Sequence, residues 1–185
     1  MRTNVLKTLD VLGVSKEEAL EYIQILEQRE QEKQQRTYIE TPLEVAYLLA
    51  DNSLEFLPHL DLNRKAEIFG IKIGKCIWKL TTSAENTTFY DASALAKKED
   101  CLLPLTDDFA DLLYGSNNKV AIINIVNIFK QNNIDINIPD GPVSFWTREK
   151  CNDGETIKAV NMYERDVYKY DPTKRTAHAH FVRYA

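Results

Sequence analysis

Two histidines near the C-terminus have a spacing that could support metal chemistry. His178 and His180 are two residues apart in a segment of β character, and side chains two apart on a strand project to the same face. A zinc site needs three or four ligands, and the remaining histidine is His59, although carboxylates could also contribute. Two exposed imidazoles on a sheet face are the simpler interpretation, so we predict no metal and no other cofactor.

A second set of residues combines aromatic and polar side chains on the C-terminal strands and loops. Tyrosine and tryptophan offer large, stiff contact surfaces and arginine offers several donors, a mixture typical of binding hot spots. The alternative is that half of these rings pack in the core or in cross-strand pairs. The predicted ligand-binding residues are Trp146, Arg148, Asn161, Tyr163, Arg165, Tyr168, Lys169, Tyr170, His178 and His180.

Linear catalytic motifs are missing from the sequence. It contains no Gly-rich phosphate loop, no nucleophile elbow and no HExxH or EF-hand pattern. The cysteines lack CxxC spacing and are interpreted as reduced, buried or half-buried thiols; they are Cys76, Cys101 and Cys151. We predict no catalytic residue. Because catalytic groups can converge from distant positions, an enzyme with a site on the C-terminal strands and the loop 150–156 remains an alternative.

Acidic residues are concentrated in the N-terminal third of the chain. The net charge is −5, and residues 1–60 hold 6 Lys+Arg against 11 Asp+Glu, whereas the rest holds 17 of each. Nucleic-acid and membrane binding require a basic surface, so we expect neither partner, although a local basic patch is compatible with these numbers. No apolar run approaches the roughly 18 residues of a membrane span, and no secretory signal is evident. We therefore expect a cytoplasmic protein.

The N-terminal third is predicted to be helical. Residues 4–12 have leucines at helical spacing. Ser15 and Glu18 form a capping box that begins a second helix. The run 27–36 is entirely polar, which is typical of a solvated spacer or a frayed helix end.

A third helix is expected over 41–50, because Thr41-Pro42-Leu43-Glu44 combines an N-cap, a proline at the first helical position and a glutamate at the third. Ser53 and Pro58 then break the pattern, which places a domain boundary near residue 60. Residues 1–60 are thus predicted to be a helical extension, which could mediate homo-oligomerisation or docking of a partner.

The middle of the chain alternates between strand and helix signals. Apolar residues alternate over 66–81, and their parity slips at Gly74, which predicts a tight turn or a bulge. Helices are expected over 88–98, over 107–113 with Thr106 as the cap, and over 120–129. Asp107 and Asp108 do not face each other on a helix, so their expected role is to stabilise the helix N-terminus.

The C-terminal segment is predicted to form a small antiparallel sheet. Strands are expected at 143–151, 156–163, 167–170 and 177–184, with a hairpin turn at Asn152-Asp153-Gly154. Short helices would cover one side of this sheet. The predicted fold class is α+β, with residues 61–185 as one domain.

The order of these motifs resembles the bacterial branch of the C-type-lectin-like fold over residues 66–185. That branch includes formylglycine-generating-enzyme-like domains and the variable proteins of diversity-generating retroelements. The resemblance is carried by Trp78, the segment Cys101–Asp107, Phe145-Trp146-Thr147, Ala159–Tyr163 and Phe181–Tyr184.

Several positions depart from that family pattern. Leu102 stands where an arginine is usual, and the catalytic cysteines of formylglycine-generating enzymes have no clear counterpart. The paired lectin cysteines and a sugar-and-calcium motif are also missing. The resemblance therefore implies binding over catalysis, with ligand-contacting side chains on the C-terminal strands.

These observations predict a non-enzymatic protein that binds a small ligand or another protein through an aromatic and polar surface. The alternatives are the enzyme described above and a structural component of a phage or surface assembly.

Overall fold

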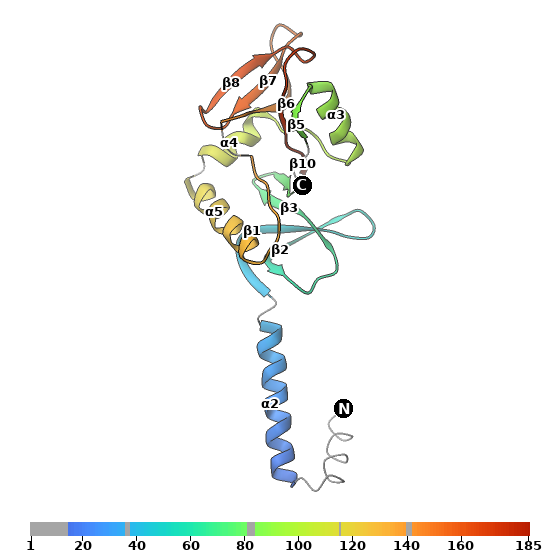
Figure 1. Cartoon of the computed structure of the whole chain (residues 1–185), viewed down its shortest axis with the longest axis vertical. Coiled ribbons are helices and arrows are strands. Elements are labelled where there is room, and N and C mark those ends of the chain that lie inside the picture. Colours follow the sequence, from blue (N-terminus) through green and yellow to red (C-terminus); the bar gives the residue numbers. More distant parts are fainter. Residues whose placement is uncertain (1–14, 36–37, 81–83, 115, 140–141) are drawn as a thin grey trace. The chain divides into compact units, whose positions relative to one another are not determined.

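The computed structural model describes residues 15–35, 38–80, 84–114, 116–139 and 142–185. Within these ranges the chain forms four helices and ten strands in two sheets, which confirms the α+β class (Figure 1). The helix expected over 4–12 lies outside the described residues. The chain divides into two compact units, one of residues 1–39 with 61–63 and the other of residues 40–60 with 64–185.

Helix α2 (Lys16–Gln35) belongs to the first unit. Its predicted capping box is confirmed, because the Ser15 N–H and hydroxyl donate to the Glu18 carboxylate while the Glu18 N–H donates to Ser15 Oγ. The helix continues through the polar run that follows Leu26 and does not end there. None of the described helices combines the length and apolar character needed to cross a membrane.

The first sheet has the strand order β10-β4-β3-β1-β2. Its strands are β1 (Tyr38–Leu48), β2 (Leu54–Asp61), β3 (Glu67–Ile73), β4 (Cys76–Lys79) and β10 (Val182–Tyr184). The turn predicted at Gly74 is confirmed: β3 and β4 form a hairpin in which Ile73 pairs with Cys76. Gly74 has φ +61°, a left-handed conformation that glycine adopts at little cost.

The helix expected over 41–50 is wrong, because these residues lie mostly in β1. Exposure alternates along the strand, with Glu40, Pro42 and Glu44 exposed and the residues between them half-buried. A period of two is that of a strand, in which one face packs against the rest of the protein and the other faces solvent. The packing of that face outweighs the local capping pattern. Pro42 precedes the register shared with β3, which begins at Glu44.

The break predicted at Pro58 is wrong, because Pro58 lies within the strand β2. Pro58 is exposed and β2 lies at the edge of the sheet, a position where a missing N–H is tolerated. Residues 40–60 therefore belong to the same compact unit as the C-terminal part of the chain.

The second sheet has the order β5-β9-β6-β7-β8. It consists of β5 (Ala84–Thr87), β6 (Ser144–Lys150), β7 (Ile157–Asn161), β8 (Asp166–Tyr170) and β9 (Ala177–Ala179). The antiparallel meander β6-β7-β8 is confirmed, whereas β9 runs parallel to β6. The single strand expected over 177–184 is wrong, because the chain leaves β9 at Ala179 and joins the other sheet as β10.

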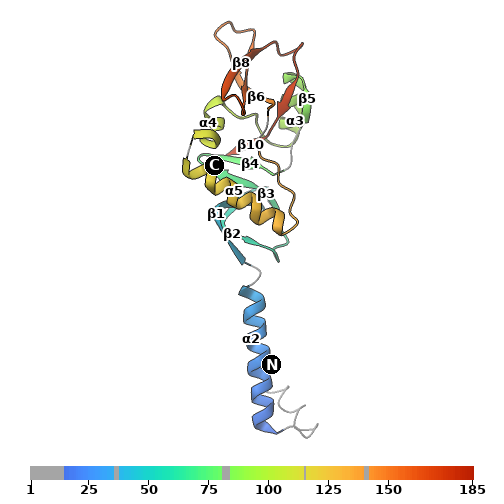
Figure 2. The same cartoon turned by 60° about the vertical axis from the view of Figure 1, so that its left-hand side comes forward.

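Helices α3 (Phe89–Lys98), α4 (Thr106–Tyr114) and α5 (Ser116–Gln131) confirm the three helices predicted for this region. α3 packs on β5 and β6, α4 packs on α5 and β7, and α5 lies beside the first sheet in both views (Figures 1 and 2). The core between α3 and the sheets contains the fully buried ring of Trp146, whose Nε1 donates to Thr87 O at 2.8 Å.

The cap of α4 differs from the prediction. Its first turn is held by two carboxylates, since Asp108 accepts the Leu105 N–H at 2.7 Å and Glu149 accepts the Thr106 N–H at 2.6 Å. The Thr106 hydroxyl is buried and makes no hydrogen bond with a described residue. Asp108 stabilises the helix start, as expected for an acidic residue there, but through a specific hydrogen bond.

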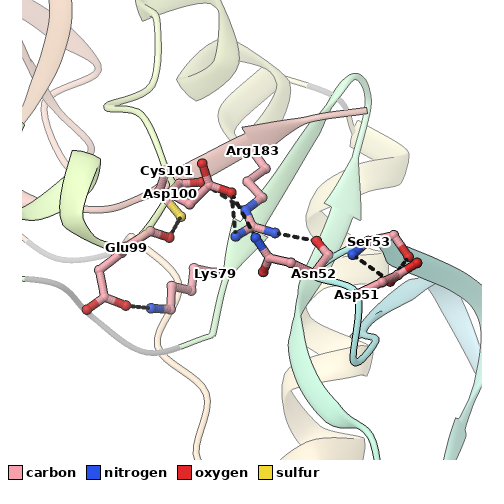
Figure 3. Close-up of polar contacts among 8 residues, drawn as sticks. All are labelled: Asp51, Asn52, Ser53, Lys79, Glu99, Asp100, Cys101 and Arg183. Carbon is pink, nitrogen blue, oxygen red and sulfur yellow. Dashed lines mark hydrogen bonds and ion pairs between the residues drawn. The ribbon is translucent and has the colours of Figure 1, made fainter.

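Arg183 on β10 connects three segments that are far apart in sequence (Figure 3). Its Nε donates to Asp100 O at 2.9 Å, its guanidinium pairs with the Asp100 carboxylate at 3.1 Å, and it reaches Asn52 O at 3.5 Å. The guanidinium also lies 4.5 Å from the centroid of the Phe69 ring. Because its donors are used inside the fold, Arg183 holds the β1–β2 loop and the end of α3 against the first sheet.

Candidate functional site

A groove of about 640 Å³ lies between α5, the extended segment 136–139 and the turn between β7 and β8. All of these parts belong to the second compact unit. The buried residues Leu112, Pro139 and Met162 are apolar and are called the floor of the groove, and the polar groups that line it are lysine, arginine, asparagine and tyrosine side chains. The lining residues are Leu112, Lys119, Ile122, Ile123, Val126, Asn127, Lys130, Ile136, Asn137, Ile138, Pro139, Met162, Tyr163 and Arg165.

Helix α5 contributes one continuous stripe to this groove. Residues 119, 122, 123, 126, 127 and 130 line the groove, and positions three and four apart lie on the same face of a helix. A different face carries Ile125 and Phe129, both fully buried. The helix therefore has two apolar faces, one that packs in the core and one that lines the groove, which explains why its sequence is apolar nearly throughout.

The segment after α5 is held in place by backbone hydrogen bonds. Asn133 has φ +59°, the left-handed conformation that commonly ends a helix, and the Ile134 N–H donates to Phe129 O at 2.9 Å. The Asn137 N–H donates to Leu80 O at 2.8 Å, which ties this wall of the groove to the end of β4. Ile136 and Ile138 line the groove from this segment.

The turn between β7 and β8 presents the third wall. The Asn161 side chain accepts the N–H groups of Tyr163 at 3.0 Å and Glu164 at 2.9 Å, which stabilises a tight turn. Arg165 has φ +57°, and the Tyr168 hydroxyl donates to the Glu164 carboxylate, a bond that raises the pKa of Tyr168 to about 12. The turn holds Tyr163 with 76 % of its surface exposed.

The charge of the groove is positive although the chain is acidic. Lys119, Lys130 and Arg165 line it, and among the described lining residues there is no carboxylate, histidine or cysteine. The two lysines are exposed, and neither forms an ion pair with a described residue. An apolar floor with cations on the rim can hold an anionic group while it buries apolar surface, but these lining groups include no acid–base pair.

Two of the ten residues predicted to bind a ligand, Tyr163 and Arg165, line this groove. Asn161 does not line the groove, but its side chain accepts the hydrogen bonds that hold the turn carrying Tyr163 and Arg165. Trp146 and His180 are fully buried, so neither side chain is displayed on the surface. The two histidines do not share a strand face, because β9 ends at Ala179.

The other predicted residues lie away from the groove lining. Arg148 is exposed and lies 4.6 Å from the centroid of the Tyr184 ring. Tyr168 stacks on Tyr170 at 6.2 Å, and the Tyr170 ring meets the edge of Trp146 at 5.8 Å.

Lys169 and His178 also lie outside the groove lining. Lys169 is exposed on β8, and His178 is half-buried with its ring 5.8 Å from that of Phe145. The described residues contain no group of three His, Cys, Asp or Glu side chains arranged to hold a metal ion.

Asp108, Tyr184, Lys75 and Cys76 form a cluster around a buried carboxylate. The Asp108 carboxylate accepts the Tyr184 hydroxyl and lies 3.9 Å from Lys75 Nζ. Burial, together with the neighbouring Asp108, raises the pKa of the Cys76 thiol to about 12. A nucleophilic cysteine requires a lowered pKa, so this cluster does not activate Cys76.

The loop 150–156, named in the enzyme alternative, is closed by its own hydrogen bonds. The Asp153 carboxylate accepts the Thr156 hydroxyl and the N–H groups of Glu155 and Thr156, which lowers the pKa of Asp153. Cys151 in this loop is buried. The Asp153 carboxylate is therefore used to stabilise the turn itself.

The groove was missed at the sequence level because its walls come from three distant segments. A usable signal was present in α5, where Lys119 and Lys130 bracket a second apolar stripe. No protein-family model, no curated protein and no solved structure matches this chain.

Proposed function

We propose that this is a non-enzymatic binding protein and that its ligand occupies the groove beside α5. The observation that carries the proposal is the convergence of exposed cations and the exposed Tyr163 over an apolar floor. Its volume of about 640 Å³ falls within the range of roughly 300–1,000 Å³ typical of ligand sites.

The walls of the groove favour binding because they are already ordered. The turn at Asn161 and the hydrogen bond from Asn137 to Leu80 hold two walls, and α5 is anchored by Ile125 and Phe129. A preformed site loses less conformational entropy when a ligand binds. Apolar contact would supply the affinity, and the cations would orient an anionic group.

The C-type-lectin-like interpretation is part of this proposal. It is supported by the two short helices on either side of Cys101–Leu105 and by the mainly antiparallel sheets. In the same proposal α2, with exposed Tyr22, Ile25 and Leu26, is a surface for self-association or partner docking, and the protein acts in the cytoplasm.

The test is chemical-shift mapping of ¹⁵N-labelled full-length protein with a library of aliphatic and aromatic carboxylate fragments. We expect perturbed amides to cluster in residues 119–130, 136–139 and 162–165. Ile123→Glu should abolish this response, because it places a negative charge in the groove at a side chain that is 51 % exposed.

A matched control is Leu95→Glu, an exposed apolar residue on α3 outside the groove, which should retain the response. Perturbations confined to other surfaces, or an Ile123→Glu protein that binds the fragments as the wild type does, would refute the proposal.

A further inference from the structure

The two lysines of the groove stand at opposite ends of one apolar stripe. Lys119 and Lys130 are eleven residues apart on α5, which corresponds to about 16 Å along the axis at 1.5 Å per residue. Between them on the same stripe lie Ile122, Ile123 and Val126. The groove therefore presents a cation, an apolar surface and a second cation in a line.

This order restricts the chemistry of the ligand. An amphiphile with one anionic head group would pair with one lysine and leave the other lysine without an anionic partner. A nucleic acid carries closely spaced phosphates and binds through dense basic surfaces, whereas here an apolar stretch separates the two cations. Arg165 already interacts within the chain, so the two lysines are the groups left to pair with an anionic ligand.

A peptide with two separated acidic side chains matches all three features. An extended chain advances about 3.3 Å per residue, and side chains an even number of positions apart project to the same face. Two acidic residues six positions apart therefore both face the groove and span about 20 Å, a distance that the flexible lysine side chains at the two ends of the stripe can match. We propose that the groove binds an extended segment of a partner protein in which two acidic residues flank five aliphatic residues. This inference rests on the proposed function and names the ligand chemistry of the same groove.

The experiment uses fluorescence anisotropy with the full-length chain and two fluorescein-labelled heptapeptides. One is Glu-Leu-Val-Leu-Val-Leu-Glu, and the other, Glu-Glu-Leu-Val-Leu-Val-Leu, has the same composition with both acids at one end. We expect the first to bind about 2–5-fold more tightly, the range of one exposed ion pair. Its affinity should fall as NaCl is raised, because salt screens exposed charges.

Variants of the protein test the assignment of each end. Lys119→Gln and Lys130→Gln should each weaken binding of the first peptide about 2–5-fold and remove its advantage over the second, because only one end then remains cationic. Lys65→Gln, an exposed lysine outside the groove lining, should change neither affinity. Equal affinities of the two peptides for the wild type, or an advantage that persists in both lysine variants, would overturn the inference.

The Ile123→Glu variant distinguishes a wrong ligand from a wrong binding site. If it abolishes peptide binding while the position of the acids has no effect, the ligand chemistry is wrong and the groove remains a binding site. If peptide binding survives Ile123→Glu unchanged, the groove is not the site and the proposed function fails with the inference.

Discussion

His180 is expected to make the stability of the fold depend on pH. The imidazole is fully buried in the link between β9 and β10, with its ring 5.5 Å from that of Trp78. Its Nε2 lies 2.9 Å from Lys79 O, and since a carbonyl only accepts, the neutral ring carries its proton on Nε2. Burial lowers the pKa of His180 to about 4, although the hydrogen bond to Lys79 opposes this shift.

The direction of the effect follows from the two pKa values. The unfolded chain has a histidine pKa near 6.5 and the folded chain a pKa of about 4, so the unfolded state binds the proton first as the pH falls. The contribution of His180 to stability is fully present above pH 6.5 and is lost as the pH falls toward 4. The loss is about 1.4 kcal/mol at pH 5.5 and about 2.5 kcal/mol at pH 4.5.

Urea denaturation of the wild type and His180→Gln at pH 4.5, 5.5, 6.5 and 7.5 tests this reasoning. Glutamine retains an N–H donor for Lys79 O and does not titrate. It should be less stable than the wild type at pH 7.5, and the difference should shrink by about 2.5 kcal/mol at pH 4.5. The wild type must be compared with the variant because other groups titrate in the same pH range. Burial tends to raise the pKa of Glu149, but its hydrogen bonds with Thr106 and Lys158 lower it overall, so its contribution to stability is also lost in acid.

Phe181→Leu is the control, since it disturbs the same buried link without removing a titrating group. It should lower the free energy of unfolding by about 1 kcal/mol to a similar extent at every pH. Parallel pH curves for the wild type and His180→Gln would refute the argument.

Three further predictions concern packing and buried polar groups. Gly70→Ala places a Cβ 2.1 Å from the carbonyl oxygen of Trp78, so urea unfolding should show a loss of about 3 kcal/mol or more; a loss below 1 kcal/mol would contradict the geometry. Tyr184→Phe removes the donor to the buried Asp108 carboxylate, and it should cost about 1–3 kcal/mol in the same assay. Because its pKa is raised to about 12, Cys76 carries very little thiolate at pH 8. A protein with Cys101→Ser and Cys151→Ser, which keeps Cys76 as its single cysteine, should therefore react with an aromatic disulfide reagent far more slowly in the native state than in denaturant; equal rates would show that the thiol is accessible.

Local signals predicted the elements that local contacts form. The capping box at Ser15, the turn at Gly74 and the β6–β7 hairpin each depend on residues within a few positions of one another. The error at β1 arose because Thr41 and the residues after it match a helix cap, whereas the alternation that decides the structure extends over a longer stretch. The break after Ala179 also depends on distant partners, since β9 pairs with β5 and β6 and β10 with β4.

The groove shows why an apolar residue cannot be assigned to the core from sequence alone. Ile125 on α5 is fully buried, whereas Ile123 is 51 % exposed and Tyr163 opposite is 76 % exposed. Complete burial of a large apolar side chain contributes about 1.5–3 kcal/mol, and in the free chain much of that contribution from Ile123 and Tyr163 is not realised. A ligand that covers both side chains would gain this free energy on binding, so the apolar residues that stabilise the fold least are those with the most to contribute to affinity.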